Sequence, residues 1–355
     1  EFLYPQMNRR LFGEPEPDDR VGSFKSIYIG QAADKSVRQG AASGGAVTAL
    51  LQFLLDKNEI DAAVVVTMDK IEPWKSRATI ALSKEELLAC RQSKYAMVAL
   101  DEIFRGFLTE KNRRFAVVGL PCHIHGIRSL QKKYPDFAAA IKYCIGIFCG
   151  FNVSGAATEF LLKKLKVKKK EVASLEYRGG PWPGGFRVKT KDGRERFIPK
   201  HDYAFVNAFF VPDRCLLCPD LTNEFADISV GDVWDDAQEL KGYSRIITRT
   251  ATGEKLLQDT VAAGELIIRN SSREALLKSH SHLFRYKKDD FGVRFRLNHL
   301  RPQFGINFPK ASLAQRLRAA GFYYLLKICR SPLGRGLLFL VPLGILQGLS
   351  RKLRK

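Results

Sequence analysis

The stretch RFAVVGLPCHIHGIRSL, Arg114 to Leu130, joins a short apolar run to a segment with helical spacing. Its first seven residues have the length and β-branched content of a buried strand, and the residues after the proline predict a helix. Cys122 lies at the turn between the two elements. Open α/β sheets carry their ligand sites at the carboxyl ends of the strands. The stretch therefore predicts an α/β fold and makes Cys122 a candidate functional residue.

The same alternation of strand and helix recurs through the first half of the chain. Further strands are predicted at Ser26–Ala32, Ile60–Met68 and Ala140–Gly150, with helices near residues 44–57, 101–110 and 154–167. This order is typical of a mostly parallel sheet with flanking helices. We therefore assign the chain to the α/β class, with mixed α+β character in its second half.

Beyond about residue 170 the pattern changes to short strands broken by glycine and proline. Asp192 and Gly193 mark the turn of a predicted hairpin. A loop-rich section at 202–236 holds a second group of cysteines, and a strand at 244–250 and a helix at 252–264 follow. We predict an extended arm at 1–25, one domain at 26–310 and a tail at 311–355. The domain has an α/β part at 26–170 and a loop-rich, cysteine-containing β part at 171–310.

The charge of the chain is uneven. The formal net charge is +21, and residues 291–355 contain thirteen Lys and Arg but no Asp or Glu. The tail also contains an uncharged run, Gly336–Ser350, interrupted by Pro342 and bounded by basic residues. This run is shorter than the ~20 residues that span a bilayer. It favours equally a segment lying in a membrane interface and a helix docked on the protein itself or on a partner.

Seven cysteines in 355 residues do not indicate a disulfide framework. The chain shows no secretory signal and begins at Glu1, so an upstream segment could be missing. We expect reduced thiols and a cytoplasmic location. Spaced cysteines in that setting indicate metal binding or catalysis.

Cys215 and Cys218 form a CxxC unit, which fits half a zinc site, half an iron–sulfur site or a redox pair. The loop-rich surroundings disfavour the redox pair. Cys122 and Cys149, both at predicted strand ends, are the best candidates to complete a four-cysteine site. Cys144 is expected on the opposite face of its strand from Cys149. Cys90 and Cys329 are expected to be bystanders, and spacing alone leaves a 4Fe-4S cluster and zinc open.

Six stretches, in order, resemble the beta-subunit family of coenzyme F420 hydrogenase and dehydrogenase. They are AASGGAVTALLQFLL, RQSKYAMV, VVGLPCHIHGIRSL, IGIFCGFNVS, YRGGPWPGGFRV and CLLCPDLTNEFADISVGDVWD. The resemblance implies FAD and a 4Fe-4S cluster, with electrons passing between cluster, flavin and a substrate such as coenzyme F420. It assigns the metal ligands to Cys122, Cys149, Cys215 and Cys218. Relatives also reduce other substrates, and some lie in polysaccharide gene neighbourhoods.

The sequence departs from the family pattern at three places. His123 stands where the family usually has glutamine, no cysteine precedes Cys90, and the basic tail is not part of the pattern. An N-terminal ferredoxin-like module, common in the family, is therefore either absent from this member or lost with a missing start. The expected partners are a ferredoxin, a hydrogenase or dehydrogenase subunit, or coenzyme F420.

The candidate residues for flavin binding come from two sources. Some lie at a helix N-terminus, which favours phosphate, and the others are supported by the family resemblance. The candidates are Ser43, Gly44, Gly45, Thr48, Ser93, Lys94, Tyr95, Gly119, Pro121 and Asp232. Asp232 can orient a loop near the flavin or cap a turn. His123 and His125 are expected to face solvent or to form hydrogen bonds with the backbone rather than to act as acid–base groups. Flavin chemistry needs no protein nucleophile, and no catalytic side chain is predicted.

Two other functions remain open on the sequence alone. A zinc-stabilised protein could bind a polyanion through the basic tail, although no recognised nucleic-acid module is present, which disfavours nucleic acid. Alternatively, an electron-transfer subunit could dock on the inner face of a membrane, or on a polysaccharide-pathway assembly, through the same tail.

Overall fold

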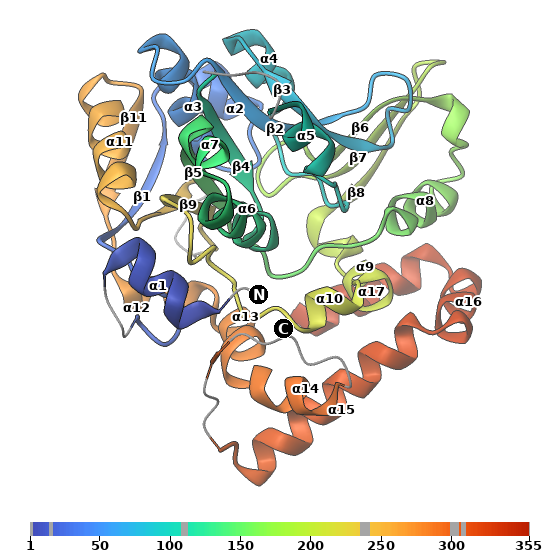
Figure 1. Ribbon diagram of the computed structural model, residues 1–355. Coiled ribbons are helices and arrows are strands. Elements are labelled where there is room, and N and C mark those ends of the chain that lie inside the picture. The colour runs from blue at the N-terminus through green and yellow to red at the C-terminus, as the bar shows by residue number, and fades with distance from the viewer. Residues whose placement is uncertain are drawn as a thin grey trace.

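The structure is a computed structural model that describes residues 3–13, 17–107, 113–234, 242–298, 305–306 and 310–354 (Figure 1). An eight-stranded sheet has the order β11-β1-β10-β9-β5-β4-β2-β3, and β6, β7 and β8 form a second, smaller sheet. The strands are β1 (Ser26–Ala32), β2 (Ala62–Met68), β3 (Ser76–Ala81), β4 (Phe115–Gly119), β5 (Ile141–Ile147), β6 (Val172–Gly179), β7 (Gly185–Thr190), β8 (Glu195–Pro199), β9 (Ile228–Asp232), β10 (Ser244–Thr248) and β11 (Leu266–Asn270).

Five strands of the large sheet run in one direction. The pairs β2–β4, β4–β5 and β5–β9 are parallel. The strand β1 has the same direction because two antiparallel steps, through β10, separate it from β9. The remaining strands, β3, β10 and β11, run the opposite way. The predicted α/β class and mostly parallel sheet are confirmed, and β9 to β11 add part of the second half of the chain to the same sheet.

Helices cover the sheet and form a separate C-terminal group. The larger ones are α1 (Tyr4–Phe12), α3 (Ala46–Asp56), α5 (Asp101–Phe107), α6 (Pro121–Lys133), α8 (Gly155–Lys164), α11 (Ala251–Ala262), α12 (Arg273–Ser279), α14 (Phe291–Leu297), α15 (Leu313–Arg330), α16 (Pro332–Leu340) and α17 (Leu343–Arg354). Shorter ones are α2 (Lys35–Gln39), α4 (Lys84–Ala89), α7 (Pro135–Ala140), α9 (Val206–Phe210), α10 (Asp213–Leu216) and α13 (Ser281–Phe284). Single turns are η1 (Lys169–Glu171), η2 (Lys200–Tyr203) and the π-helical η4 (Arg285–Asp289).

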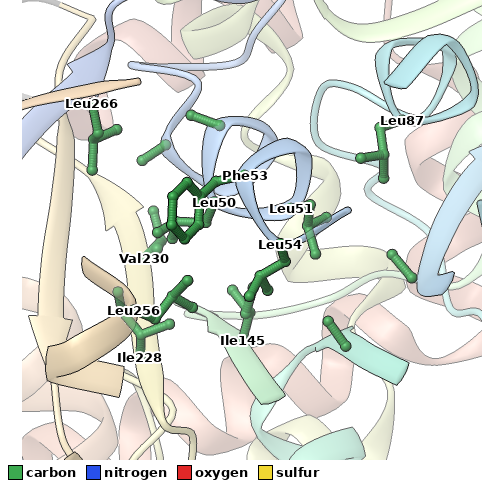
Figure 2. Close-up of a cluster of buried hydrophobic side chains, with 14 of the residues drawn as sticks. Leu50, Leu51, Phe53, Leu54, Leu87, Ile145, Ile228, Val230, Leu256 and Leu266 are labelled. Atoms are coloured by element: carbon green, nitrogen blue, oxygen red, sulfur yellow. The ribbon is translucent and has the colours of Figure 1, made fainter. Parts of the chain in front are cut away.

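The core beside α3 shows why the first half folds as predicted. Leu50 and Leu54, four positions apart on the helix, are buried with Ile145, Ile228 and Val230 of the sheet (Figure 2). Residues at this spacing share one face of a helix, and β-branched residues suit the pleated surface of a sheet. The residues of the predicted helix at 101–110 that are described form α5, and residues 108–110 lie outside the described part.

The second sheet follows the predicted short strands. The turn between β7 and β8 contains Gly193 at φ +85°, and Asp192 accepts a hydrogen bond from the Thr190 hydroxyl. Glycine adopts this backbone conformation without steric cost. The predicted hairpin is therefore confirmed.

The prediction of an extended arm is wrong for its first part. Tyr4–Phe12 forms α1, whose Tyr4 and Met7 are buried against the core beside β4 and α6. The proline at its start and Gly13 at its end are standard helix boundary residues. None of the described helices combines the length and the apolar composition that crossing a bilayer requires.

Candidate functional site

Several of the predicted site residues lie along one edge of the large sheet. The carboxyl ends of the five strands that run in the same direction must all lie at this edge. Cys122 is the second residue of α6, directly after β4, and Cys149 follows the end of β5 by two residues. Asp232 is the last residue of β9. Adjacent strands thus bring together residues up to 110 positions apart in the sequence.

The CxxC unit reaches this edge through the loop that follows it. Cys215 lies in α10 and Cys218 just after it. The Cys149 N–H donates a hydrogen bond to the Leu221 carbonyl at 2.8 Å. The Asn223 side-chain amide donates to the Gly119 carbonyl, also at 2.8 Å. These bonds fix the loop to the ends of β4 and β5, and sequence reasoning had given Asn223 no role.

The four candidate thiols are close enough to influence one another electrostatically. Cys122 is the most exposed of the four, and partial desolvation together with the charges of Cys218 and Cys215 raises the pKa of its thiol to about 11. Burial is also the main cause of the raised pKa of Cys149, to which the other three thiols add. All seven cysteines are free, and the structure therefore brings Cys122, Cys149, Cys215 and Cys218 together as reduced thiols.

A buried cation accompanies the thiols. Lys287 in η4 is 1% exposed, and among the described residues no carboxylate forms an ion pair with it. Its neighbour Lys288, in contrast, pairs with Glu224. Burial alone would lower the pKa of Lys287, but the charges of Cys218, Cys149 and Cys215 raise it above its ordinary value. Lys287 therefore lies within electrostatic range of the candidate metal ligands.

Tyr286 is a second polar group near the same thiols. Its hydroxyl is buried and has no hydrogen-bond partner in the described part of the chain. Burial raises the pKa of this hydroxyl, and the charges of Cys215 and Cys218 contribute to that shift. A buried hydroxyl without a partner costs free energy. The site thus contains a buried donor suited to an acceptor group that the chain itself does not supply.

The arrangement does not match a site for a single metal ion. Within the described residues, no three His, Cys, Asp or Glu side chains surround a point that could hold one. A four-cysteine zinc site needs all four sulfurs ~2.3 Å from the ion. A 4Fe-4S cluster binds each cysteine at a different iron and requires the sulfurs to lie further apart. A four-thiolate donor set is common to 4Fe-4S clusters and four-cysteine zinc sites.

Of the two histidines beside Cys122, His123 contacts the backbone and His125 contacts a buried carboxylate. A ring nitrogen of His123 lies 3.1 Å from the Val98 carbonyl. His125 contacts the buried Asp220 carboxylate at 2.9 Å. Asp227 pairs with Arg128 and accepts the Cys144 N–H, so it also has a structural role. Cys144 itself is fully buried in the core.

Arg178, which the sequence reasoning did not single out, connects the flavin candidates. Its fully buried side chain pairs with the Asp232 carboxylate at 2.8 Å and contacts the Tyr95 hydroxyl at 3.2 Å. It also donates to the Ala42 carbonyl, directly before Ser43. Burial alone would raise the pKa of Tyr95, but Lys200 and Arg178 hold it below its ordinary value. Four segments distant in the sequence therefore meet at one guanidinium.

Aromatic rings lie over this guanidinium. The ring centroids of Trp182 and Trp234 are 5.0 Å apart, and Arg178 lies 4.9 Å from the Trp182 ring. His201 of η2, the turn that follows β8, contacts the Trp234 ring. Half-buried aromatic rings beside a fixed cation are suited to planar ring systems.

The glycines before α3 have structural reasons of their own. A Cβ at Gly44 would lie 2.4 Å from the Gly30 carbonyl oxygen, and Gly45 adopts φ +77°. The Gly44 N–H donates to the Ser244 hydroxyl, which also contacts the Ser43 hydroxyl. Thr48 lies in the first turn of α3, where N–H groups lack partners within the helix. The anion-binding potential of this segment therefore rests on that first turn.

A cavity of about 460 Å³ lies next to the Arg178 site, lined by Gln92, Ser93, Lys94 and Tyr177 among others. Its volume is in the range of cofactor and ligand sites. Burial lowers the pKa of Lys94 to about 8. Its ammonium donates to the carbonyls of Cys90, Arg91 and Gln92. A phosphate contact by Lys94 would require it to leave these carbonyls.

The thiol site and the Arg178 site adjoin each other. A Cβ at Gly231 would lie 2.2 Å from the Phe148 ring, so Phe148, next to Cys149, packs directly on β9. His280 contacts the Phe148 ring at 5.8 Å. Burial lowers the pKa of His280 to about 4, against the opposing effect of Asp232. Asp232 belongs to the Arg178 site, so the two sites are joined through β5 and β9.

Cys122 and Cys149 thus lie at the carboxyl ends of strands, where α/β sheets place their ligand sites, and Cys215 and Cys218 lie near them. Comparison with known proteins gives the family. The model for the N-terminal part of the coenzyme F420 hydrogenase/dehydrogenase beta subunit matches residues 27–105, and the model for its C terminus matches residues 112–274. The chain belongs to this family of oxidoreductases, as the six sequence stretches predicted.

Individual relatives support the same assignment. The chain is 31% identical over 253 residues to the coenzyme F420 hydrogenase subunit beta of Methanothermobacter thermautotrophicus, covering 69% of this chain and 84% of that protein. It is 32% identical to a subunit of the F420H2 dehydrogenase of Methanosarcina mazei, covering 61% of this chain and 58% of that protein. A chain of the F420-reducing nickel–iron hydrogenase complex of Methanosarcina barkeri has the same fold, with TM-score 0.63 and 22% identity, over 82% of this chain and 99% of that one.

Proposed function

We propose that the chain is a flavin-dependent iron–sulfur oxidoreductase. It would pass electrons between a 4Fe-4S cluster, FAD and an acceptor such as coenzyme F420 or another organic substrate. One observation supports the proposal: four cysteines from three segments lie within electrostatic range of Lys287, a buried cation that forms no ion pair with a described carboxylate. A cluster bound by four thiolates is negatively charged, and Lys287 would balance part of that charge.

Cys122, Cys149, Cys215 and Cys218 would ligate the cluster. The Tyr286 hydroxyl and the Lys287 ammonium would donate to its sulfur atoms. Hydrogen bonds to the sulfurs and burial are the means by which a protein sets the reduction potential of such a cluster. Leu216 and Tyr323 exclude water from this side of the site.

The flavin would lie along the neighbouring part of the edge. When bound, FAD can accept electrons one at a time and donate them as a pair, or the reverse. The first turn of α3, with Ser43, Gly44, Gly45 and Thr48, would receive the pyrophosphate. Arg178 would hold Tyr95 and Asp232 in place, and Ser93, Lys94, Gly119 and Pro121 would complete the site. The cavity and the tryptophan pair beside Arg178 support this position.

The electron donor and acceptor are inferred from the family. The two named relatives belong to a coenzyme F420 hydrogenase and an F420H2 dehydrogenase. We therefore propose a hydrogenase or dehydrogenase subunit, or a ferredoxin, as redox partner, and coenzyme F420 as the first acceptor to test. The C-terminal tail would allow peripheral contact with the cytoplasmic face of a membrane.

Anaerobic purification and reconstitution test the proposal. The expected product has the absorption of both flavin and iron–sulfur, about four irons and one FAD per chain. Stopped-flow reoxidation of the reduced protein would then be followed with coenzyme F420, ferredoxin and other organic acceptors. A colourless protein that takes up zinc but neither iron nor flavin would exclude the proposal and favour the zinc-stabilised binding protein.

Replacement of Lys287 by methionine is expected to lower the reduction potential of the iron–sulfur centre. The substitution removes a buried positive charge, and reduction adds a negative charge at the same place. We expect the equilibrium constant for reduction to fall at least tenfold, which is ~59 mV for a one-electron couple. A redox titration followed by electron paramagnetic resonance measures the change. Lys287→Arg keeps the charge and should stay close to the unmodified protein. Equal potentials for the methionine variant and the unmodified protein, at equal iron content, would exclude this role.

A further inference from the structure

The apolar run of the tail, Gly336–Ser350, is buried against the protein at some positions and exposed at others. Leu338 and Leu346 are buried in the same core as Phe160 and Phe210. Lys164 donates to the Val341 carbonyl at 2.6 Å, which ties the middle of the run to α8. The run Gly336–Ser350 is therefore docked on the protein through Leu338 and Leu346, while Leu337, Leu340 and Ile345 are exposed. Docking on the protein was one of the two alternatives that the sequence left open.

The inner side of α15 is also docked. Ala319, Tyr323 and Leu326, spaced by four and three residues, are buried. Arg330 of the same helix pairs with Asp213 of α10 at 2.8 Å, and Arg318 pairs with Asp290 at 2.7 Å. These contacts hold the helix in one orientation about its axis. Its other side must therefore face outward.

That outward side is apolar. Residues at helical spacing on one face of α15, and others that continue along α16, are exposed: Leu313, Leu317, Tyr324, Leu325, Ile328, Leu333, Leu337 and Leu340. We call these eight residues the outer apolar face. In Figure 1 the two helices form the orange to red rim of the molecule, away from the large sheet. Apolar patches of this extent on a folded chain mark interaction sites.

The charges around the outer apolar face indicate what it contacts. Arg316 and Lys327 of α15 are exposed beside it. Residues 291–355 contain no Asp or Glu, so no acidic side chain from this segment offsets them. Asp213 and Asp290 pair with Arg330 and Arg318, whereas Arg316 and Lys327 form no ion pair with a described carboxylate. An apolar stripe bordered by such cations complements an anionic bilayer surface, where headgroups meet basic residues and acyl chains meet leucines.

We propose that the outer apolar face of α15 and α16 binds the surface of an anionic lipid bilayer, with both helices lying parallel to it. This inference rests on the proposed membrane contact and makes it specific to one face. It does not depend on the cofactors. Because the inner side of α15 stays packed on the protein, binding requires no unfolding of the tail.

Vesicle co-sedimentation of the full chain tests the proposal. Unmodified protein should sediment with vesicles of phosphatidylglycerol and phosphatidylcholine, and at least tenfold less with phosphatidylcholine alone or at high salt. The double variant Leu317→Glu/Ile328→Glu places two charges on the outer apolar face and should bind the anionic vesicles at least tenfold more weakly. Ile71→Glu is the matched control, because Ile71 is 89% exposed but lies in the turn between β2 and β3. It should bind like the unmodified protein.

Absence of binding to anionic vesicles, or equal binding by the double variant, would overturn the proposal. So would a dimer in solution that the double variant converts to a monomer without any vesicle binding, since the outer apolar face would then join two copies of the chain. Measuring the iron and flavin content of the same protein distinguishes failure of the lipid-surface proposal from failure of the proposed redox function. Vesicle binding by a protein that never loads iron or flavin would leave the lipid surface supported and the redox function excluded.

Discussion

A chain carrying Cys122→Ser should lose its iron–sulfur absorption and its electron transfer to any acceptor. Cys122 follows β4 directly, and its thiol lies among Cys149, Cys215 and Cys218. Removing even an outer-shell partner of a metal site typically costs 10–100-fold in affinity or activity, so loss of a direct ligand should cost at least ~100-fold in activity. Iron analysis, visible absorption and acceptor reduction after anaerobic reconstitution measure the effect.

Cys329→Ser is the matched control for this substitution. Cys329 is half-buried in α15 and is a free thiol, like the others. It should keep full iron content. If Cys122→Ser retained the iron and the absorption of the unmodified protein, Cys122 would not be a ligand, and the four-cysteine assignment would fail.

The second large effect is expected from Arg178→Met. Arg178 is fully buried and holds the Asp232 carboxylate, the Tyr95 hydroxyl and the Ala42 carbonyl. Methionine fills similar volume but leaves Asp232 as a charge without its partner. Breaking a buried pair in this way costs about 3–5 kcal/mol. We expect that decrease in the free energy of unfolding, measured by urea denaturation, together with loss of bound FAD.

Arg187→Met provides the comparison within the same small sheet. Arg187 lies in β7, pairs with Glu195 at 2.7 Å, and is partly exposed. Pairs of this kind contribute about 0–1 kcal/mol. A destabilisation by Arg178→Met no larger than that of Arg187→Met would show that Arg178 does not connect the site. Retention of FAD by a folded Arg178→Met chain would remove it from the flavin proposal.

The sequence predicts the strand-end cysteines because their signal is local. Cys122 and Cys149 each follow an apolar run of strand length, and strand ends in α/β sheets are known ligand positions. The βαβ alternation likewise reflects helical and strand periods within short windows. The strand-end cysteines and the alternation of strands and helices can be predicted because composition and spacing within short stretches determine them.

Arg178 and Lys287 could not be found in the same way. An arginine in a short strand and a lysine in a basic segment both look like solvated surface residues. Arg178 is buried only because its partners, 54 and 136 positions away in the sequence, fold against it. Lys287 is buried because η4 packs beside the thiols. Such roles depend on tertiary contacts that no local pattern contains.

The C-terminal tail also shows what local sequence patterns do not determine. Its apolar composition is plain in the sequence, but which side of each helix faces the protein is not. Ala319 and Tyr323 are buried while Leu317 and Leu325 are exposed, although all four belong to α15. The orientation is decided by partners such as Asp213 and Asp290, far from the tail in the sequence.

The direct pairing of β5 with β9 has a consequence for the proposed electron transfer. Paired strands lie ~4.8 Å apart, and Cys149 and Asp232 stand at or just beyond the same ends of these two strands. In the proposed arrangement, the spacing between the cluster ligand Cys149 and the flavin-side residue Asp232 would be set by backbone hydrogen bonds rather than by flexible loops. Loop insertions or a different acceptor would then change specificity while leaving this internal transfer distance unaltered.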